Sequence, residues 1–170
     1  MIAALRGRVA EVGDDHVVLE TGGEVGAVGY LVHCAASTLQ RLPTTGQSVR
    51  LRIVTQVREE SITLYGFVSV EEETWFRLLQ NIQGVGARLA LSLLSVLEPA
   101  AIARAIAAQD ARALTRAAGV GPRLAARIVA ELKDRVAKFP LANDVPVGAA
   151  GVPPPAAGSG AVADALQALE

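Results

Sequence analysis

The sequence contains little of several residue types, and each shortage narrows what the protein can be. Cys34 is the only cysteine, so no disulfide can form within the chain. His16 and His33 have no second ligand pair at metal-binding spacing, so we expect no zinc site. No run approaches the roughly 20 apolar residues of a membrane span, and charge appears too early at the N-terminus for a signal peptide. We therefore expect a cytoplasmic protein with no cofactor and no membrane contact.

Lysine is also scarce. Only Lys133 and Lys138 are lysines among the 16 basic residues, and the others are arginines, whose guanidinium groups pair well with phosphate oxygens. In an alanine-rich and arginine-rich chain this bias can equally reflect genome composition. The formal net charge of -1 means that nucleic-acid binding would need a local basic surface and backbone amides. The chain lacks a Gly-x4-Gly-Lys-Ser/Thr phosphate loop, so we do not expect it to hydrolyse ATP.

The first third of the chain has the pattern of short strands. Five segments alternate apolar and polar residues or are rich in β-branched residues, namely LRGRVAEV, HVVLET, AVGYLVHC, VRLRIVTQV and ITLYGF. Stretches rich in turn-forming residues separate most of them. Five short strands in about 65 residues favour a small barrel of the OB type. We therefore predict an OB-fold β-barrel over residues 1–67.

A helical pattern follows the predicted barrel. Ser69 with Glu72 three residues later indicates a capping box. Pro99 is typical of the first turn of a helix and Asp110 of an N-cap, so two further helices are expected to begin there. We predict an all-α domain over residues 68–139, which makes the protein an α+β multidomain chain.

The remaining residues differ in composition. Residues 140–160 are rich in Pro, Gly and Ala, which predicts a flexible linker. Residues 161–170 regain a helical stripe, but a lone helix of about ten residues is marginal in water. We interpret this segment as the first helix of a C-terminal domain that the chain cuts short.

Two short glycine-containing segments are the strongest functional signal. QGVGA and AGVGP place one valine between Gly84 and Gly86 and between Gly119 and Gly121. A tight turn between helices favours glycine, because it requires positive φ or close backbone approach. The helix that follows each turn presents unpaired amides and the positive end of its dipole, which together can bind an anion.

The same arrangement recurs at an offset of 35 residues, from Gly84 to Gly119. Arg88 and Arg123 each lie two residues after the second glycine, where they can reach the same phosphate. One such turn also fits an ordinary corner between packed helices, but two copies with a basic residue at the same place favour tandem helix-hairpin-helix motifs. Such motifs contact the sugar-phosphate backbone and do not read sequence.

The order of these segments resembles the RuvA family, the Holliday-junction-binding subunits of bacterial branch migration complexes. The resemblance covers residues 1–135 and is carried by MIAALRGRV, VREESITLYGF, ETWFRLLQNIQGVGARLALSLLS and LTRAAGVGPRLAARIVAELKDR. It implies a non-catalytic subunit that holds four-way junction DNA open for the hexameric ATPase RuvB, which binds the third domain. It also implies a homotetramer, or an octamer of two facing tetramers, with the resolvase RuvC as a further partner.

The resemblance also implies roles for individual residues. The phosphate-binding positions would be Gly84, Gly86, Arg88, Gly119, Gly121, Arg123 and Arg127. Glu59 and Glu60 match the family's acidic pin, whose carboxylates would converge in a tetramer and repel phosphates at the crossover. Without the resemblance, two charges at a β-turn are more simply explained as solvated residues. Arg58, beside them, is interpreted as a contact to the displaced strand.

Three departures from the family pattern bear on these expectations. GGEVGAVGY is longer than the usual GGVGY, and Pro122 with Arg123 replaces a common basic pair. The chain also stops at Glu170, before the rest of the third domain, which argues against RuvB binding by this chain.

Two other classes of function fit the same residues less well. A glycosylase with lyase activity would need a lysine amine close to a hairpin and a pocket for a flipped base, and neither hairpin contains a lysine. A general duplex-binding module, or a structural module whose hairpins are simple corners, remains an alternative.

Overall fold

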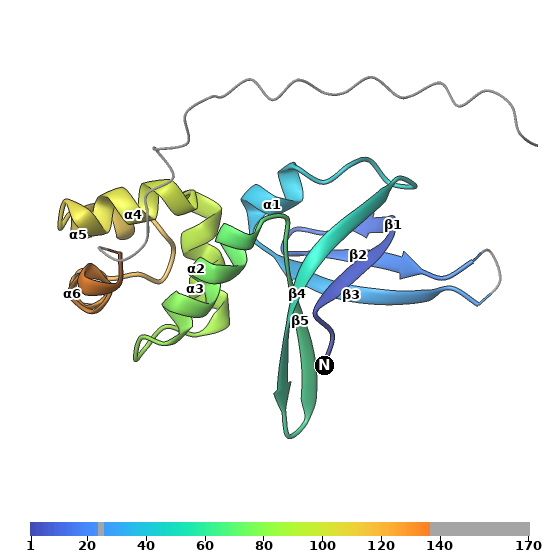
Figure 1. Ribbon diagram of the computed structural model, residues 1–170, viewed down its shortest axis with the longest axis horizontal. Helices are drawn as coiled ribbons and strands as arrows, with labels where there is room; N and C mark the ends of the chain where they lie inside the picture. The colour runs from blue at the N-terminus through green and yellow to red at the C-terminus, as the bar shows by residue number, and fades with distance from the viewer. Residues whose placement is uncertain (24–25, 137–170) are drawn as a thin grey trace, which may run out of the picture.

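The computed structural model describes residues 1–23 and 26–136, and it consists of a β-barrel followed by a helical unit (Figure 1). The predicted linker 140–160 and the predicted terminal helix 161–170 lie outside the described residues. Within the described part, the predicted α+β class is confirmed.

Five strands form the barrel. They are β1 (Ala4–Val12), β2 (His16–Thr21), β3 (Val28–Cys34), β4 (Ser48–Arg58) and β5 (Ser61–Phe67). The sheet closes in the order β1-β2-β3-β5-β4, and every pair is antiparallel except β3 with β5. Alternate side chains point inward, as a half-buried strand requires, so that Val17, Leu19, Leu51 and Ile53 are almost fully buried. The predicted five-stranded barrel is confirmed.

The helical unit contains α2 (Val70–Gln80), α3 (Ala87–Val96), α4 (Pro99–Ala107), α5 (Ala111–Leu114) and α6 (Pro122–Val136). The expected helix starts are present. The Ser69 side chain accepts a hydrogen bond from the Glu72 amide, the Asp110 side chain accepts from two amides of α5, and Pro99 is the first residue of α4. These local signals work because each depends only on residues within one helical turn.

The second half of the predicted capping box is wrong. The Glu72 carboxylate does not return to the Ser69 amide; it accepts from the Val68 amide at 3.2 Å and from the Thr38 hydroxyl at 3.3 Å, and it forms an ion pair with Arg41. Thr38 lies on α1 (Ala36–Gln40), a short helix that the sequence analysis did not predict. The almost fully buried Glu72 therefore joins the barrel side of the molecule to the first helix of the helical unit.

The two units also share a hydrophobic core. Phe67 at the end of β5 and Val54 of β4 are buried in the same cluster as the helices. The rings of Phe67 and Phe76 have centroids 4.8 Å apart, within the range of favourable aromatic pairs. Backbone and side-chain groups of α1 bond to Ser95 and to the Leu94 carbonyl of α3. These contacts hold the β4–β5 hairpin in a defined position relative to the helices.

No single helix among the described residues is long and apolar enough to cross a membrane. α3 and α4 would meet the length and composition of a span only as a pair, and they are bent by 93° at their junction. Their apolar side chains, such as Leu93 and Ile102, are fully buried in the core of the helical unit.

Candidate nucleic-acid interface

The two glycines of each hairpin have different structural roles. Gly84 and Gly119, the first glycines, have φ of +91° and +84°, a left-handed conformation that other residues adopt only with strain. Gly86 is extended, with φ of -87°, and forms the N-cap of α3 without a side-chain cap. A Cβ added at Gly86 or at Gly121 would meet nothing within 4 Å. The first glycine thus makes the turn, and the second leaves the helix N-terminus uncovered.

The valine between the glycines is buried in both hairpins. Val85 and Val120 are each 5% exposed. Their amides donate equivalent turn hydrogen bonds, from Val85 to the Ile82 carbonyl at 3.0 Å and from Val120 to the Ala117 carbonyl at 3.1 Å. The same backbone turn is therefore built twice, with the valine anchoring it to the core.

The two hairpins contact each other through equivalent positions. The Ser92 hydroxyl donates to the Ala118 carbonyl at 3.0 Å, and Arg127 Nη1 donates to the Gln83 carbonyl at 3.1 Å. Ser92 and Arg127 are separated by the same 35 positions as Gly84 and Gly119, and so are Gln83 and Ala118.

The packing at the glycines is reciprocal too. A Cβ at Gly119 would lie 2.9 Å from Leu89 Cδ2, and one at Gly84 would lie 3.5 Å from Leu124 Cδ1. Leu89 and Leu124 again occupy equivalent places, each three residues after its second glycine. Such exchanged contacts are those of two similar units related by a local twofold axis, and they hold both helix N-termini in one rigid arrangement.

Arg88 and Arg123 are exposed, and neither takes part in an ion pair within residues 1–23 and 26–136. Both remain available for the predicted phosphate contacts. Arg127 is also exposed, but one of its five N–H donors is engaged by the Gln83 carbonyl. The structure thus gives Arg127 a second role, which is to tie α6 to the first hairpin.

The structure also brings a carboxylate close to the first hairpin, and no sequence pattern predicted it. Asp15 follows β1 and shares a cleft with Arg88 of α3. The hydrogen bond from His16 Nδ1, at 2.9 Å, holds the pKa of Asp15 below its usual value, and the nearby His33 and Arg88 act in the same direction. No local pattern indicated this proximity, because Asp15 and Arg88 belong to different units of the fold.

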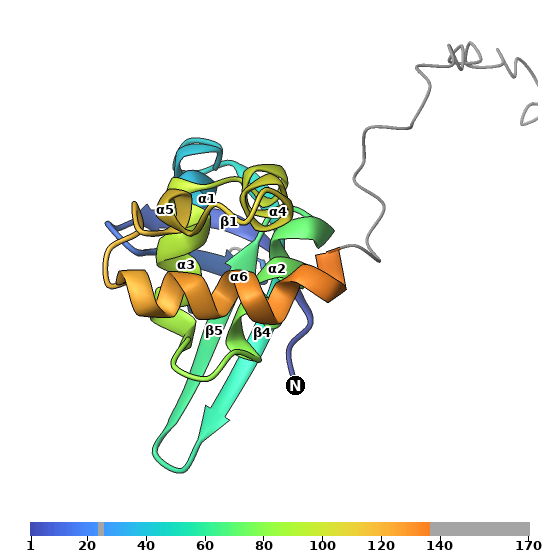
Figure 2. The same cartoon turned by 90° about the vertical axis from the view of Figure 1, so that its left-hand side faces the viewer.

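The predicted acidic pin is a hairpin tip. Glu59 and Glu60 form the turn between β4 and β5, next to the cross-strand pair Arg58 and Ser61. All four residues are exposed. The hairpin extends beyond both the barrel and the helical unit (Figures 1 and 2). The two carboxylates are therefore carried away from the body of the protein.

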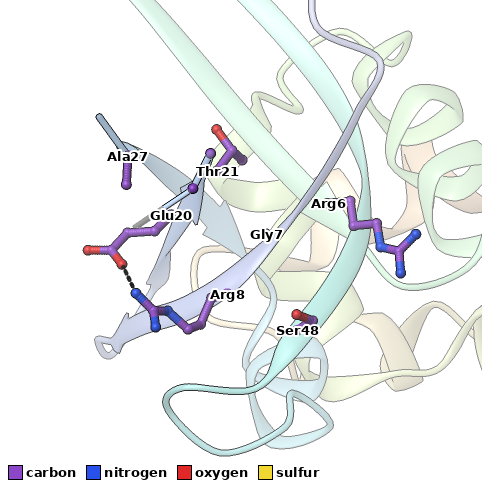
Figure 3. A pocket seen from close by; sticks show the side chains of 9 residues that line it. Arg6, Gly7, Arg8, Glu20, Thr21, Ala27 and Ser48 are labelled. Atoms are coloured by element: carbon purple, nitrogen blue, oxygen red, sulfur yellow. Dashed lines mark hydrogen bonds and ion pairs between the residues drawn. The ribbon is translucent and has the colours of Figure 1, made fainter. Parts of the chain in front are cut away.

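A second basic region lies on the outer face of the barrel. Arg6 of β1 is directly opposite Arg50 of β4. Their neighbours on the same face are neutralised: Arg8 pairs with Glu20 at 3.1 Å (Figure 3), and Arg52 pairs with Glu73 of α2. Within the described residues Arg6 and Arg50 form no ion pair. The alternating arginines of LRGR and VRLR are visible in the sequence and indicate a basic strand face. The sequence does not reveal the cross-strand register that places Arg6 opposite Arg50.

Glu73 accepts from two arginines, Arg52 and Arg77. Burial alone would raise the pKa of Glu73, but the hydrogen bonds from these guanidinium groups outweigh it and lower that pKa. This carboxylate therefore stays ionised and holds the start of α2 against β4.

Metal ligands and a reactive thiol do not contribute to this surface. In the two stretches that the structure describes, no group of three or more His, Cys, Asp or Glu side chains could hold a metal ion. Cys34 is 3% exposed, and burial raises the pKa of its thiol to about 12. A thiol with so high a pKa is a poor nucleophile at neutral pH.

Comparison with known proteins agrees with this architecture. The profile described as RuvA N terminal domain matches residues 1–66, and the profile described as SAM-like helix-hairpin-helix tandem matches residues 76–134. The chain is 53% identical over 169 residues to the Holliday junction branch migration complex subunit RuvA of Methylobacterium radiotolerans, covering 99% of this chain and 80% of the relative. It is 52% identical over 173 residues to the subunit of Methylocella silvestris, with 99% and 80% covered. Against the Azorhizobium caulinodans subunit it is 51% identical over 170 residues, with 99% and 81% covered. The chain belongs to the RuvA family of Holliday junction branch migration complex subunits.

Proposed function

We propose that this protein binds four-way (Holliday) junction DNA and holds it open for branch migration. The observation that carries the proposal is the pair of reciprocally packed hairpins, each with an uncovered helix N-terminus and an exposed arginine two residues after the second glycine. The relatives, which are named as subunits of the branch migration complex, support the same function.

The backbone of the hairpins explains how they can bind phosphate. Gly86 caps α3 without a side-chain hydrogen bond, so the amides of the first turn lack protein partners and can donate to a phosphate. Arg88 and Arg123 add positive charge beside the turns. The second glycines Gly86 and Gly121 allow the phosphate to approach the backbone closely. Contacts of this kind position the DNA and are indifferent to its sequence.

The pin supplies the opposite electrostatic effect. Glu59 and Glu60 are exposed at the end of a projecting hairpin, where their charges repel phosphates and favour a structure whose strands separate there. Arg58 lies one residue from the tip and suits a phosphate of the displaced strand. In a homotetramer four pins would converge at the junction centre, which would match the fourfold shape of the open DNA.

The proposal extends to assembly and partners. We infer a cytoplasmic homotetramer, or an octamer of two facing tetramers, that acts with RuvB and with the resolvase RuvC. The subunit itself is not catalytic, since ATP hydrolysis is the task of RuvB and the chain has no phosphate loop. We assign the barrel to residues 1–67, the helix-hairpin-helix domain to residues 68–139 and a linker to residues 140–160.

A competition gel shift at moderate salt tests the proposal. A synthetic four-way junction is set against linear duplexes of the same sequences. We expect a large preference for the junction, with affinity that falls steeply as salt increases, because phosphate contacts dominate. Equal binding to both forms would favour a general duplex-binding module. Absence of binding would show that the hairpins only connect packed helices.

The pin has its own test. Replacing Glu59 and Glu60 by Gln should raise the affinity for linear duplex and so reduce the preference for the junction, because the repulsion is removed while the hairpins are intact. The same gel shift measures both affinities. An unchanged duplex affinity would contradict the electrostatic role of the two carboxylates.

A further inference from the structure

An exposed apolar pair lies directly behind the acidic tip. Val57 of β4 and Ile62 of β5 are opposite each other in the hairpin, and each is 70% exposed. Single exposed apolar residues are ordinary. Two β-branched residues side by side at the end of a projecting element are a less ordinary arrangement, because they present apolar surface on both strands at once.

The two faces of the projecting hairpin differ in polarity. Along β4, Leu51, Ile53 and Val57 share the face that lines the barrel interior, and on β5 Leu64 and Ile62 share it. Leu51, Ile53 and Leu64 are buried in the barrel core, whereas Val57 and Ile62, one cross-strand pair before the last pair of the hairpin, are exposed. The opposite face has the polar pairs Gln56 with Thr63 and Arg58 with Ser61.

Strand propensity does not explain the pair. Threonine is β-branched and would stabilise an exposed strand as well as valine or isoleucine does, without exposing apolar surface. Among the described residues nothing covers Val57 and Ile62, so an apolar partner beyond these residues is the simplest physical reason for them.

We infer, on the basis of the proposed function, that Val57 and Ile62 contact the faces of the bases at the junction crossover. A base face is flat, uncharged and poorly hydrated, so it suits an apolar pair. A phosphate does not, and the adjacent Glu59 and Glu60 repel it. Apolar side chains of DNA-bending proteins contact unstacked base steps in the same chemical manner. The tip of the hairpin thus repels the DNA backbone. One face of the hairpin contacts bases, and Arg58 on the other face can bind a phosphate.

The charges of the tip argue against a second copy of the chain as the partner. If the apolar pairs of neighbouring pins packed together, the carboxylates of Glu59 and Glu60 in each copy would be brought close to those of the next. Like charges at short range in a partly desolvated site repel strongly. Bases carry no such penalty.

The test uses a four-way junction with 2-aminopurine at the base pair next to the crossover, because this base fluoresces more when it is unstacked. The full chain should raise the fluorescence on binding. The Val57→Thr/Ile62→Thr variant keeps the strand propensity and the carboxylates. It should bind the junction within about threefold of the unmodified chain, since the hairpins supply the phosphate contacts, but lose most of the fluorescence increase.

Two controls make the result specific. Val28→Thr/Leu31→Thr removes two exposed apolar side chains from β3, 52% and 48% exposed and on opposite faces of that strand, and should leave the fluorescence increase intact. A probe placed well inside an arm should respond equally to all variants.

Three outcomes would overturn the inference. One is an undiminished increase at the crossover with Val57→Thr/Ile62→Thr, which would show that the carboxylates suffice. Another is a changed sedimentation coefficient of that variant, which would assign the pair to contacts between copies. The third is an equal loss from the Val28→Thr/Leu31→Thr control. If the unmodified chain showed no junction preference, the proposed function itself would fail, and the gel shift reports that separately.

Discussion

The two hairpins have the same backbone but different chemical surroundings. In the first, Ala87 begins α3 and Arg88 shares a cleft with the ionised Asp15 of the barrel. In the second, Pro122 begins α6. Arg123, like Arg88, forms no ion pair within the described residues, but of the two only Arg88 acts on the pKa of Asp15. A turn geometry can therefore be duplicated through its glycines and its buried valine while the electrostatics of the two copies diverge.

Because of this difference, the two hairpins should rely on different groups to bind phosphate. The first turn of α3 can offer the amides of Ala87, Arg88 and Leu89, whereas Pro122 has no N–H and removes one donor from the first turn of α6. The first hairpin should therefore depend more on its amides, and the second more on Arg123.

Adding a side chain at both helix N-termini should cause the largest loss of junction affinity. Gly86→Ala/Gly121→Ala adds two methyl groups that meet nothing in the protein, so the free energy of unfolding should change little. They occupy the space that a phosphate needs, and we expect junction affinity to fall about a hundredfold, with about tenfold from each blocked hairpin. A gel shift and a thermal melt measure the two quantities. Full affinity in the double variant would show that the phosphates do not approach there.

Substitution of the first glycines, Gly84 and Gly119, should instead lower the stability of the fold. Gly119→Ala forces alanine into a left-handed conformation and brings its Cβ to 2.9 Å from Leu89 Cδ2, whereas Gly84→Ala carries the conformational strain with only an ordinary contact to Leu124. We expect both to lower the free energy of unfolding by about 1–2 kcal/mol, with Gly119→Ala the more damaging. Chemical denaturation measures this, with Gly121→Ala as the matched control. Equal stability of the first-glycine and second-glycine variants would contradict the assigned roles.

The two arginines should differ in strength. Arg123→Ala should reduce affinity for junction and duplex by roughly tenfold and flatten the salt slope by about 1. Arg88→Ala should cost less, roughly threefold, because Asp15 already offsets part of its charge and the amides of α3 remain. Titrations at several salt concentrations provide both values. A larger loss from Arg88→Ala would reverse the proposed division.

The smallest effect is expected from the carboxylate. Asp15→Asn should raise junction affinity about twofold at low salt, because one negative charge is removed beside the first hairpin. Since the pKa of Asp15 is lowered, the group is ionised at neutral pH, where the affinities are compared. The gain should vanish in an Arg88→Ala background if it acts through that arginine. A gain that persists there would assign Asp15 to general repulsion.

Local signals located most elements and most of the candidate site. The alternation of β-branched residues identified all five strands, and the Ser69 and Asp110 caps and Pro99 identified helix starts. The Gly-Val-Gly repeats indicated both turns. Each of these depends on residues within a few positions of one another, where backbone sterics and hydrogen bonding act directly.

The short helix α1 was missed for the same reason. It spans Ala36–Gln40, and its N-cap Ala35 offers no side-chain hydrogen bond. A helix of this length is not stable on its own. Its bonds to α3 and the ion pair of Arg41 with Glu72 hold it in place, and these partners are distant in sequence.

Side-chain periodicity and local backbone preference were enough to predict the barrel strands, the helix starts and the two glycine turns. They could not predict that Glu72 bonds across to α1, that Asp15 shares a cleft with Arg88, or that Arg127 and Ser92 tie the hairpins together. Nor could they predict that Val57 and Ile62 are left exposed outside the core. These contacts depend on strand register and on how the two units pack, and both arise only when distant segments bury their apolar surfaces together.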